Sequence, residues 1–522
     1  MQAAALTFCL QGLDAYPIRV EVDSGRGPAS FQMVGLPEAS VRESRVRVRA
    51  ALQQCGIELD EYVITVNLAP ADLRKSGGAY DLAIAAATLA ALRRIPVEAL
   101  EQVGLLGELS LSGAVQPVRG VLAALRGAAA RGVPRAIVPR GNAREAASLA
   151  SIQGIEVRVV GHLKELVAHL AAGKALDGPG EAPTVGAEAG DEGLDLADVC
   201  GQHAARRALE VAAAGGHNLL LVGPPGSGKT MLARRLPGLL PPLSFEESLE
   251  LTAIHSVAGL LSADRGIVAA RPFRAPHHTV SVAGLIGGGD PVRPGEVSLA
   301  HHGCLFLDEL LEFRRSVTEA LRQPLEEGQV TLSRARARVT FPARPLLLAA
   351  TNPCPCGFAG DRLRRCACSV ERVRAYRARL SGPLLDRIDL HVAMPPVEVA
   401  QICAVARGES SAAVRARVTA ARAVQAARCA RGEASTPLNA ALGPRDLARV
   451  AAPDAEGTAL LARAVERLGL SARAYGKVLR VSRTLADLAG SEGVGAIHVA
   501  EAIGMRLLDR EISAAAPLAA ET

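Results

Sequence analysis

The chain has 522 residues, a formal net charge of +6, 49% hydrophobic residues and 21% charged residues. This length exceeds what one hydrophobic core usually supports, so we expect about three to four folding units. The hydrophobic content excludes a largely disordered chain. Aromatic residues make up only 2%, which argues against binding of nucleic acid by base stacking but leaves binding through phosphates open.

The first residues do not resemble a secretory signal, because no Lys or Arg precedes the apolar stretch within residues 1–11. The longest apolar run, residues 82–92, is too short to span a bilayer and is followed by two arginines. We therefore expect a cytoplasmic protein that does not enter the membrane. Its 10 Cys residues should then be reduced rather than paired as disulfides.

The front of the chain, residues 1–172, alternates extended and helical patterns and predicts an α/β domain. Strands are expected at 18–22, 62–68 and 135–139, and helices at 40–55, 80–93 and 121–131. Residues 173–193 are rich in Gly, Pro, Ala and acidic residues without periodicity, which is typical of a linker.

The second half predicts a parallel sheet followed by a helical unit. In residues 194–396 short apolar strands are expected at 218–222, 304–307, 345–350 and 388–392. Helical stretches flank each strand, and short apolar strands that alternate with helices imply a parallel sheet. Residues 397–522 are almost wholly helical by pattern, which predicts a C-terminal helical lid.

A complete phosphate-binding loop lies between a predicted strand and a predicted helix. Its residues are Gly223, Pro224, Pro225, Gly226, Ser227, Gly228, Lys229 and Thr230. Glycines let backbone N–H groups approach phosphate oxygens, Lys229 is expected to reach the β- and γ-phosphates, and Thr230 is expected to ligate Mg²⁺. ATP binding follows from the full pattern in this setting.

An acidic pair follows the next apolar strand. Asp308 is expected to hold Mg²⁺ and Glu309 to polarise the attacking water, because a parallel sheet presents its ligands at the carboxyl ends of its strands. Acidic pairs also occur as ordinary loop residues, but the upstream phosphate loop favours the catalytic interpretation.

Three further residues resemble functional residues of AAA+ ATPases. Asn352, after the strand expected at 345–350, is similar to the sensor that positions water near the γ-phosphate. Arg387 matches the arginine finger that such ATPases insert into the neighbouring subunit's site, which implies a ring. Arg473, at the expected start of a lid helix, matches the second sensor.

Residues 271–279, 284–289 and 295–303 carry the more specific resemblance. They are similar to magnesium-chelatase-like AAA+ proteins and most closely resemble the ComM (YifB) family, over nearly the whole chain. Members of that family are hexameric ATP-driven DNA motors implicated in branch migration during natural transformation. The resemblance therefore implies a homo-hexameric helicase that acts on single-stranded or branched DNA.

A β-hairpin is expected at residues 330–341, with Arg334, Arg336 and Arg338 and no acidic residue. It resembles the hairpin that related helicases point into the ring channel, where arginines would grip DNA phosphates without regard to sequence. The alternative is an ordinary hairpin edge that its charges keep soluble.

Four cysteines cluster as two C-x-C pairs. Cys354, Cys356, Cys366 and Cys368 could close a tetrahedral Zn²⁺ site that stiffens the loop after Asn352, and free thiols are the alternative.

Residues 75–81 and 106–120 resemble the proteolytic domain of Lon proteases. The serine nucleophile of such proteases falls on Ala79 and the lysine on Leu122, so both chemical groups are missing. Neighbouring Ser76 keeps an ATP-dependent protease open as an alternative, beside a protein-remodelling ATPase and a magnesium-chelatase motor subunit.

Overall fold

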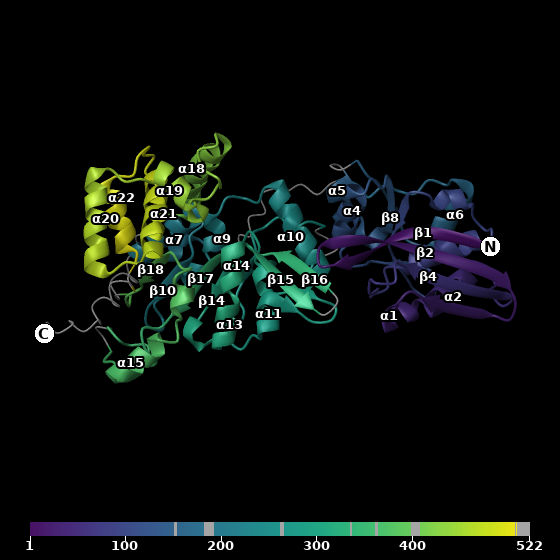
Figure 1. Cartoon of the computed structure of the whole chain (residues 1–522), viewed down its shortest axis with the longest axis horizontal. Helices are drawn as coiled ribbons and strands as arrows, with labels where there is room; N and C mark the ends of the chain where they lie inside the picture. The colour runs from purple at the N-terminus through teal and green to yellow at the C-terminus, as the bar shows by residue number, and fades with distance from the viewer. Residues whose placement is uncertain are drawn as a thin grey trace.

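The computed structural model describes residues 1–150, 154–181, 193–261, 266–334, 337–360, 364–397, 408–506 and 508. The chain is elongated, with the N-terminal region at one end, the C-terminal helices at the other and a second sheet between them (Figure 1). None of the helices in this described part combines the length and apolar composition that a membrane span needs.

The N-terminal region is built on a seven-stranded mixed sheet with the order β3-β4-β2-β1-β5-β8-β9. The strands are β1 (Gln2–Gln11), β2 (Asp14–Arg26), β3 (Ser30–Val34), β4 (Tyr62–Ala69), β5 (Val103–Leu105), β8 (Arg135–Pro139) and β9 (Glu156–Val160). β1 and β2 form an antiparallel hairpin, whereas β5, β8 and β9 run parallel. The short pair β6 (Glu108–Leu109) and β7 (Val115–Gln116) lies apart.

Helices pack on this sheet, and the longest apolar run of the sequence forms one of them, α3. They are α1 (Ala39–Arg42), α2 (Ser44–Gln54), α3 (Asp81–Ala91), α4 (Val121–Ala130), α5 (Ala143–Ala150) and α6 (Leu163–Ala172). Every residue of α3 is buried, and a helix that is apolar on all sides belongs in a core. The expected α/β arrangement of this region is confirmed.

The middle of the chain holds a five-stranded, all-parallel sheet with the order β11-β14-β17-β10-β18. Its strands are β10 (Leu219–Val222), β11 (Phe273–Arg274), β14 (Cys304–Leu307), β17 (Leu346–Thr351) and β18 (Leu390–Ala393). The four longer strands confirm the sequence prediction. β11 was missed, since two residues form no apolar run.

Helices and short strands complete this middle region. The helices are α7 (His203–Gly215), α8 (Lys229–Ala233), α9 (Leu236–Leu239), α10 (Phe245–Ala258), α11 (Val282–Ile286), α12 (Glu296–Leu299), α13 (Arg315–Ala320), α14 (Arg322–Glu327), α15 (Val370–Arg377) and α16 (Gly382–Leu385). β12 (Gly287–Gly288) pairs with β13 (Arg293–Pro294). β15 (Gln329–Arg334) and β16 (Ala337–Pro342) form the expected hairpin.

The C-terminal region is helical, as expected. It contains α18 (Ser411–Ala430), α19 (Pro444–Val450), α20 (Ala455–Leu468), α21 (Ala472–Leu488) and α22 (Ala496–Gly504). The side chains of Ser410, Asp454 and Ser471 cap α18, α20 and α21, which explains where these helices begin. Residues of α18 and α21 share a hydrophobic core with α7 and with β10, β17 and β18.

Several contacts join the N-terminal region to the middle region, and two of them involve α10 and the hairpin. Leu249 and Ala253 of α10 are buried in one cluster with Leu122 and Leu125 of α4. The turn between β1 and β2 meets the hairpin, because a Cβ on Gly12 would lie 2.4 Å from a methyl carbon of Val339. The N-terminal region therefore packs against the hairpin, which lies beside it in Figure 1.

Candidate functional site

The phosphate-binding loop leaves the carboxyl end of β10 in a shape that requires glycine. Gly226 and Gly228 have φ angles of +80° and +90°, which residues other than glycine adopt only at an energetic cost. A Cβ on Gly223 would lie 2.4 Å from the carbonyl oxygen of Met394. The backbone of the loop is therefore determined by its sequence.

Lys229 points back into this loop. Its Nζ donates to the carbonyl oxygens of Gly223 (2.7 Å) and Pro224 (2.9 Å) and to Oδ1 of Asn352 (3.2 Å). Burial lowers the pKa of Lys229, and the charges of Asp308 and Glu309 oppose that shift. The structure thus brings together the predicted lysine and the predicted sensor.

The acidic pair stands beside the loop, at the carboxyl end of β14. Oγ1 of Thr230 donates to Oδ2 of Asp308 at 2.7 Å, and the N–H of Glu309 donates to Oδ1 of Asp308 at 3.0 Å. Hydroxyl and carboxylate oxygens are the ligands that Mg²⁺ prefers, so Thr230 and Asp308 together fit such an ion. Glu309 itself has a left-handed φ of +51°, a conformation that non-glycine residues adopt mainly where the surroundings enforce it.

A cavity of about 320 Å³ opens in front of these groups. It is lined by Thr230, Arg234, Phe273, Ala275, Pro276, His277, His278, Phe306, Asp308 and Glu309. Nδ1 of His278 lies 3.9 Å from Oε2 of Glu309. The sequence prediction left the histidines unassigned and did not consider Arg234. The sequence did offer a clue to His278, because it lies in residues 271–279, the stretch that resembles magnesium-chelatase-like proteins and also contains β11.

Arg387 and Arg473 lie outside the residues that line this cavity. The guanidinium of Arg387 donates to Glu326 and to the carbonyl oxygen of Pro383 (2.6 Å), and Arg473 pairs with Asp386 at 3.1 Å. The hydrogen bond from Arg387 lowers the pKa of Glu326, and the charge of Arg473 adds to that effect. The two predicted arginines therefore belong to one ion-pair cluster of their own.

The hairpin presents one apolar and one exposed face. Val330, Val339 and Phe341 are buried, while Arg338, opposite Ser333, is exposed. The backbone of Arg334 pairs with Ala337 at the end of the ladder. Arg336 lies outside the described residues.

The four clustered cysteines converge. Sγ of Cys354 lies 3.3 Å from Sγ of Cys356 and 3.7 Å from Sγ of Cys366. The four Sγ atoms, including that of Cys368, all lie within 4.8 Å of one another. Four thiolates about 2.3 Å from one zinc ion would be about 3.8 Å apart, so this donor set fits a tetrahedral site. The backbone N–H groups of Phe358 and Ala367 lower the pKa of Cys356 to about 6. The N–H of Cys368 lowers the pKa of Cys366, but burial and the neighbouring thiols of Cys356 and Cys354 raise it to about 11.

The cysteine loop also touches the phosphate-binding loop. Gly357 has a φ of +86°, and a Cβ at this position would lie 2.5 Å from Cδ of Pro225. Any change in the shape of the cysteine loop therefore reaches the phosphate-binding loop directly.

A second group of possible ligands, Glu250 with His301 and His302, is better explained by hydrogen bonds. Nδ1 of His301 accepts the N–H of Arg344 at 3.0 Å, so its proton sits on Nε2, which is 3.1 Å from Glu250. A protonated Nε2 cannot ligate a metal. Burial lowers the pKa of His301 to about 4, and this ring stays neutral.

The two Lon-like stretches lie in the N-terminal region, where Ala79 and Leu122 provide neither the serine hydroxyl nor the lysine amine that Lon-type cleavage needs. Leu122 is buried and its N–H donates to Glu145 Oε1 at 2.8 Å. Lys75, the first residue of the Lon-like stretch 75–81, is buried, and its Nζ donates to the carbonyl oxygens of Gly35 (3.0 Å) and Pro70. Burial lowers the pKa of Lys75.

A phosphate-binding loop, an acidic strand end and a polar sensor on one parallel sheet define a P-loop nucleotide-binding protein with a helical C-terminal region. Comparison with family models matches residues 195–402 to "Magnesium chelatase, subunit ChlI", 20–142 to "Subunit ChlI of Mg-chelatase" and 408–506 to "Magnesium chelatase, subunit ChlI C-terminal".

Full-length relatives narrow this class. The uncharacterized protein Rv2897c of Mycobacterium tuberculosis is 46% identical, covering 96% of this chain and 98% of its own length. YifB of Escherichia coli is 44% identical and competence protein ComM of Haemophilus influenzae 42% identical, each covering 96% of both chains. The chain therefore belongs to the ComM (YifB) family of magnesium-chelatase-like AAA+ proteins. A separate match to Lon protease 2 of Bacillus subtilis, 29% identical over 147 residues, covers 27% of this chain and 26% of that protein, and it agrees with the Lon-like N-terminal region.

Proposed function

We propose that this chain is an ATP-hydrolysing AAA+ motor that works as a homo-hexameric ring on DNA. One observation carries the proposal: two hydrogen bonds, from Lys229 to Asn352 and from Thr230 to Asp308, bring these four side chains together at the carboxyl edge of a parallel sheet. Groups with these chemistries, held at one edge, suit phosphoryl transfer, in which catalysis is mostly positioning and charge stabilisation.

Each residue has a definite part in this scheme. Lys229 exchanges carbonyl oxygens for phosphate oxygens, and Asn352 and Glu309 orient the attacking water. Mg²⁺, when bound by Thr230 and Asp308, neutralises charge on the phosphates. Ring formation is supported by Arg387 and Arg473, which cluster with Glu326 and Asp386 instead of lining the cavity of their own chain. We propose that both arginines serve the site of the neighbouring subunit.

The proposed substrate is single-stranded or branched DNA. The hairpin exposes Arg338 on the face opposite its apolar side, and arginines on a protrusion grip phosphates without reading sequence. A relative that is named a competence protein supports a part in recombination during natural transformation. We propose branch migration as the activity.

A three-strand junction assay tests this function. The wild type should move the branch point when ATP is present, and Glu309→Gln should not, although it still binds ATP. Intact ATP hydrolysis without strand movement would refute the helicase assignment.

Three alternatives are tested with the same material. A magnesium-chelatase motor subunit is the second candidate, because all three matched models are described by chelatase subunit ChlI. Stimulation of ATP hydrolysis by forked DNA favours the helicase over a chelatase motor or a protein-remodelling ATPase. Degradation of casein would indicate the protease, which Ala79 and Leu122 argue against.

We also propose a structural zinc ion held by Cys354, Cys356, Cys366 and Cys368. The contact between Gly357 and Pro225 gives the ion an effect on ATP binding as well as on the sensor loop. The purified protein should contain about one zinc per chain, and Cys354→Ser should lower both the zinc content and the rate of ATP hydrolysis. Cys200→Ser, at an exposed cysteine outside the cluster, is the matched control. Wild-type protein with almost no zinc would contradict the proposal.

A further inference from the structure

The segment that carries Arg387 is anchored by the side chain of Asn218, the residue before β10. Nδ2 of Asn218 donates to the carbonyl oxygen of Arg387 at 2.9 Å, and its Oδ1 accepts the N–H of Leu347 at 2.9 Å. The carbonyl oxygen of Asn218 accepts the N–H groups of Asp389 (2.9 Å) and Leu390 (3.0 Å). Asn218 thus joins the amino ends of three neighbouring strands, and only a side chain with one donor and one acceptor fits.

The preceding residue, His217, links the same segment to the C-terminal helices. Its Nδ1 lies 3.3 Å from Oδ2 of Asp389, and its Nε2 lies 2.8 Å from Oγ1 of Thr484 in α21. A Cβ on Gly215 would lie 2.2 Å from Nε2 of His217 and 2.5 Å from Oγ1 of Thr484. The glycine is therefore required for this contact. Burial opposes ionisation of Asp389, but the hydrogen bond with His217 and the charge of Lys477 lower its pKa to about 2.

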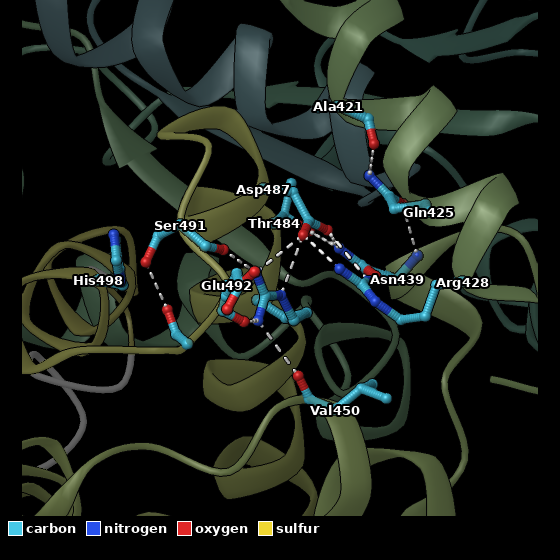
Figure 2. Close-up of polar contacts among 12 residues, drawn as sticks. Ala421, Gln425, Arg428, Asn439, Val450, Thr484, Asp487, Ser491, Glu492 and His498 are labelled. Atoms are coloured by element: carbon cyan, nitrogen blue, oxygen red, sulfur yellow. Dashed lines mark hydrogen bonds and ion pairs between the residues drawn. The ribbon is translucent and has the colours of Figure 1, made fainter. Parts of the chain in front are cut away.

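Thr484 is itself part of a buried polar network of the lid (Figure 2). Nδ2 of Asn439 donates to Oγ1 of Thr484 at 3.1 Å and to Oδ2 of Asp487 at 2.7 Å. From the same helix, Nζ of Lys477 donates to the carbonyl oxygen of Ile388 at 2.8 Å. The lid network and the segment around Arg387 are therefore one connected set of hydrogen bonds.

We infer that Asn218 is a positioning residue for Arg387, and that His217 ties this position to the lid. The guanidinium of Arg387 is bound to Glu326 of its own chain, so it must swing away to reach a neighbouring site. Its backbone has to stay in place during this movement, and Asn218 is the side chain that holds it. The inference rests on the proposed function, in which Arg387 completes the ATP site of the next subunit.

Mixed rings of two variants that each hydrolyse ATP poorly or not at all test the inference. Asn218→Asp keeps the acceptor for Leu347 but loses the donor to Arg387. We expect it to lower kcat for ATP about tenfold or more, because arginine fingers contribute much larger factors, while KM and nucleotide binding change little. Lys229→Ala has a defective phosphate-binding loop and an intact finger. In a one-to-one mixture, about a quarter of the interfaces pair a sound loop with a sound finger, so hydrolysis should recover.

Two controls make the outcome unambiguous. Asn352→Asp carries the same chemical change within the phosphate site, so mixing it with Lys229→Ala should restore nothing. Arg387→Ala mixed with Lys229→Ala should recover and tests the shared site itself. If this mixture recovers and the Asn218→Asp mixture does not, Asn218 serves its own site and the inference is overturned. If neither recovers, the shared site fails and the inference fails with it. Should Asn218→Asp not bind nucleotide, Asn218→Ser replaces it in the same mixtures.

Discussion

Replacing Asp487 by Asn should destabilise the lid strongly, because this carboxylate balances two buried arginines. Its side chain is fully buried and pairs with Arg428 at 2.5 Å (Figure 2) and with Arg483 at 2.9 Å. The side chains of Arg428 and Arg483 are 9% and 2% exposed. Asn has almost the same shape but no charge, so both guanidinium groups would remain buried without a counter-charge. Removing one partner of a buried ion pair costs about 3–5 kcal/mol.

Hydrogen–deuterium exchange of peptides from α21 measures this loss directly. A decrease of about 3–5 kcal/mol in the free energy of lid opening accelerates exchange by about two to four orders of magnitude. Asp454→Asn is the matched control in the same region. Asp454 accepts the N–H of Gly457 at 2.7 Å as a helix cap, and Asn caps equally well. If the two variants exchanged at similar rates, the reasoning about buried charge would be refuted.

Three further predictions concern the loop contacts, the buried histidine and the hairpin. Gly357→Ala should weaken ATP binding, measured with a fluorescent analogue, because the added Cβ would lie 2.5 Å from Pro225 and the φ angle is +86°. Unchanged affinity would show that the cysteine loop does not affect the phosphate-binding loop. The pKa of His301 falls from 6.5 to about 4 on folding, so its contribution to stability is complete above pH 6.5 and is lost as the pH falls toward 4. Between pH 6.5 and 5 the loss is roughly 2 kcal/mol, and urea unfolding of His301→Gln should lack this component; an equally steep pH dependence in the variant would show that other groups cause it. Replacing Arg334 and Arg336 by Ala should weaken DNA binding and reduce its salt dependence while sparing nucleotide binding; unchanged DNA affinity would move the grip elsewhere.

Local sequence patterns were sufficient for the elements of the nucleotide site. The strands that end at Val222 and Leu307 were predicted where they occur, because short apolar runs beside helical patterns indicate buried parallel strands. Thr230 and Asp308, which follow these two strands, meet at 2.7 Å because parallel strands present their carboxyl ends at one edge of the sheet. The clustering of Cys354, Cys356, Cys366 and Cys368 could also be predicted, because the four residues are close together in the sequence.

Contacts between distant residues could not be predicted from these patterns. The role inferred for Asn218 depends on atoms of Leu347 and Arg387, which lie 129 and 169 positions further along the chain. Nothing in the sequence near His217 indicates that it meets Thr484, 267 positions away. Such pairs form only when helices and sheet pack together, and packing is decided by the whole core.

The sequence by itself determined that this chain has a phosphate-binding loop, an acidic strand end and a helical lid, because backbone conformation and strand burial are written in local composition. Only the tertiary structure decided that Arg387 and Arg473 form a cluster apart from the cavity, that Gly357 touches Pro225, and that the N-terminal region packs against the hairpin. These arrangements depend on side chains that are brought together across the fold, where burial and pairing of charge, rather than local propensity, control the free energy.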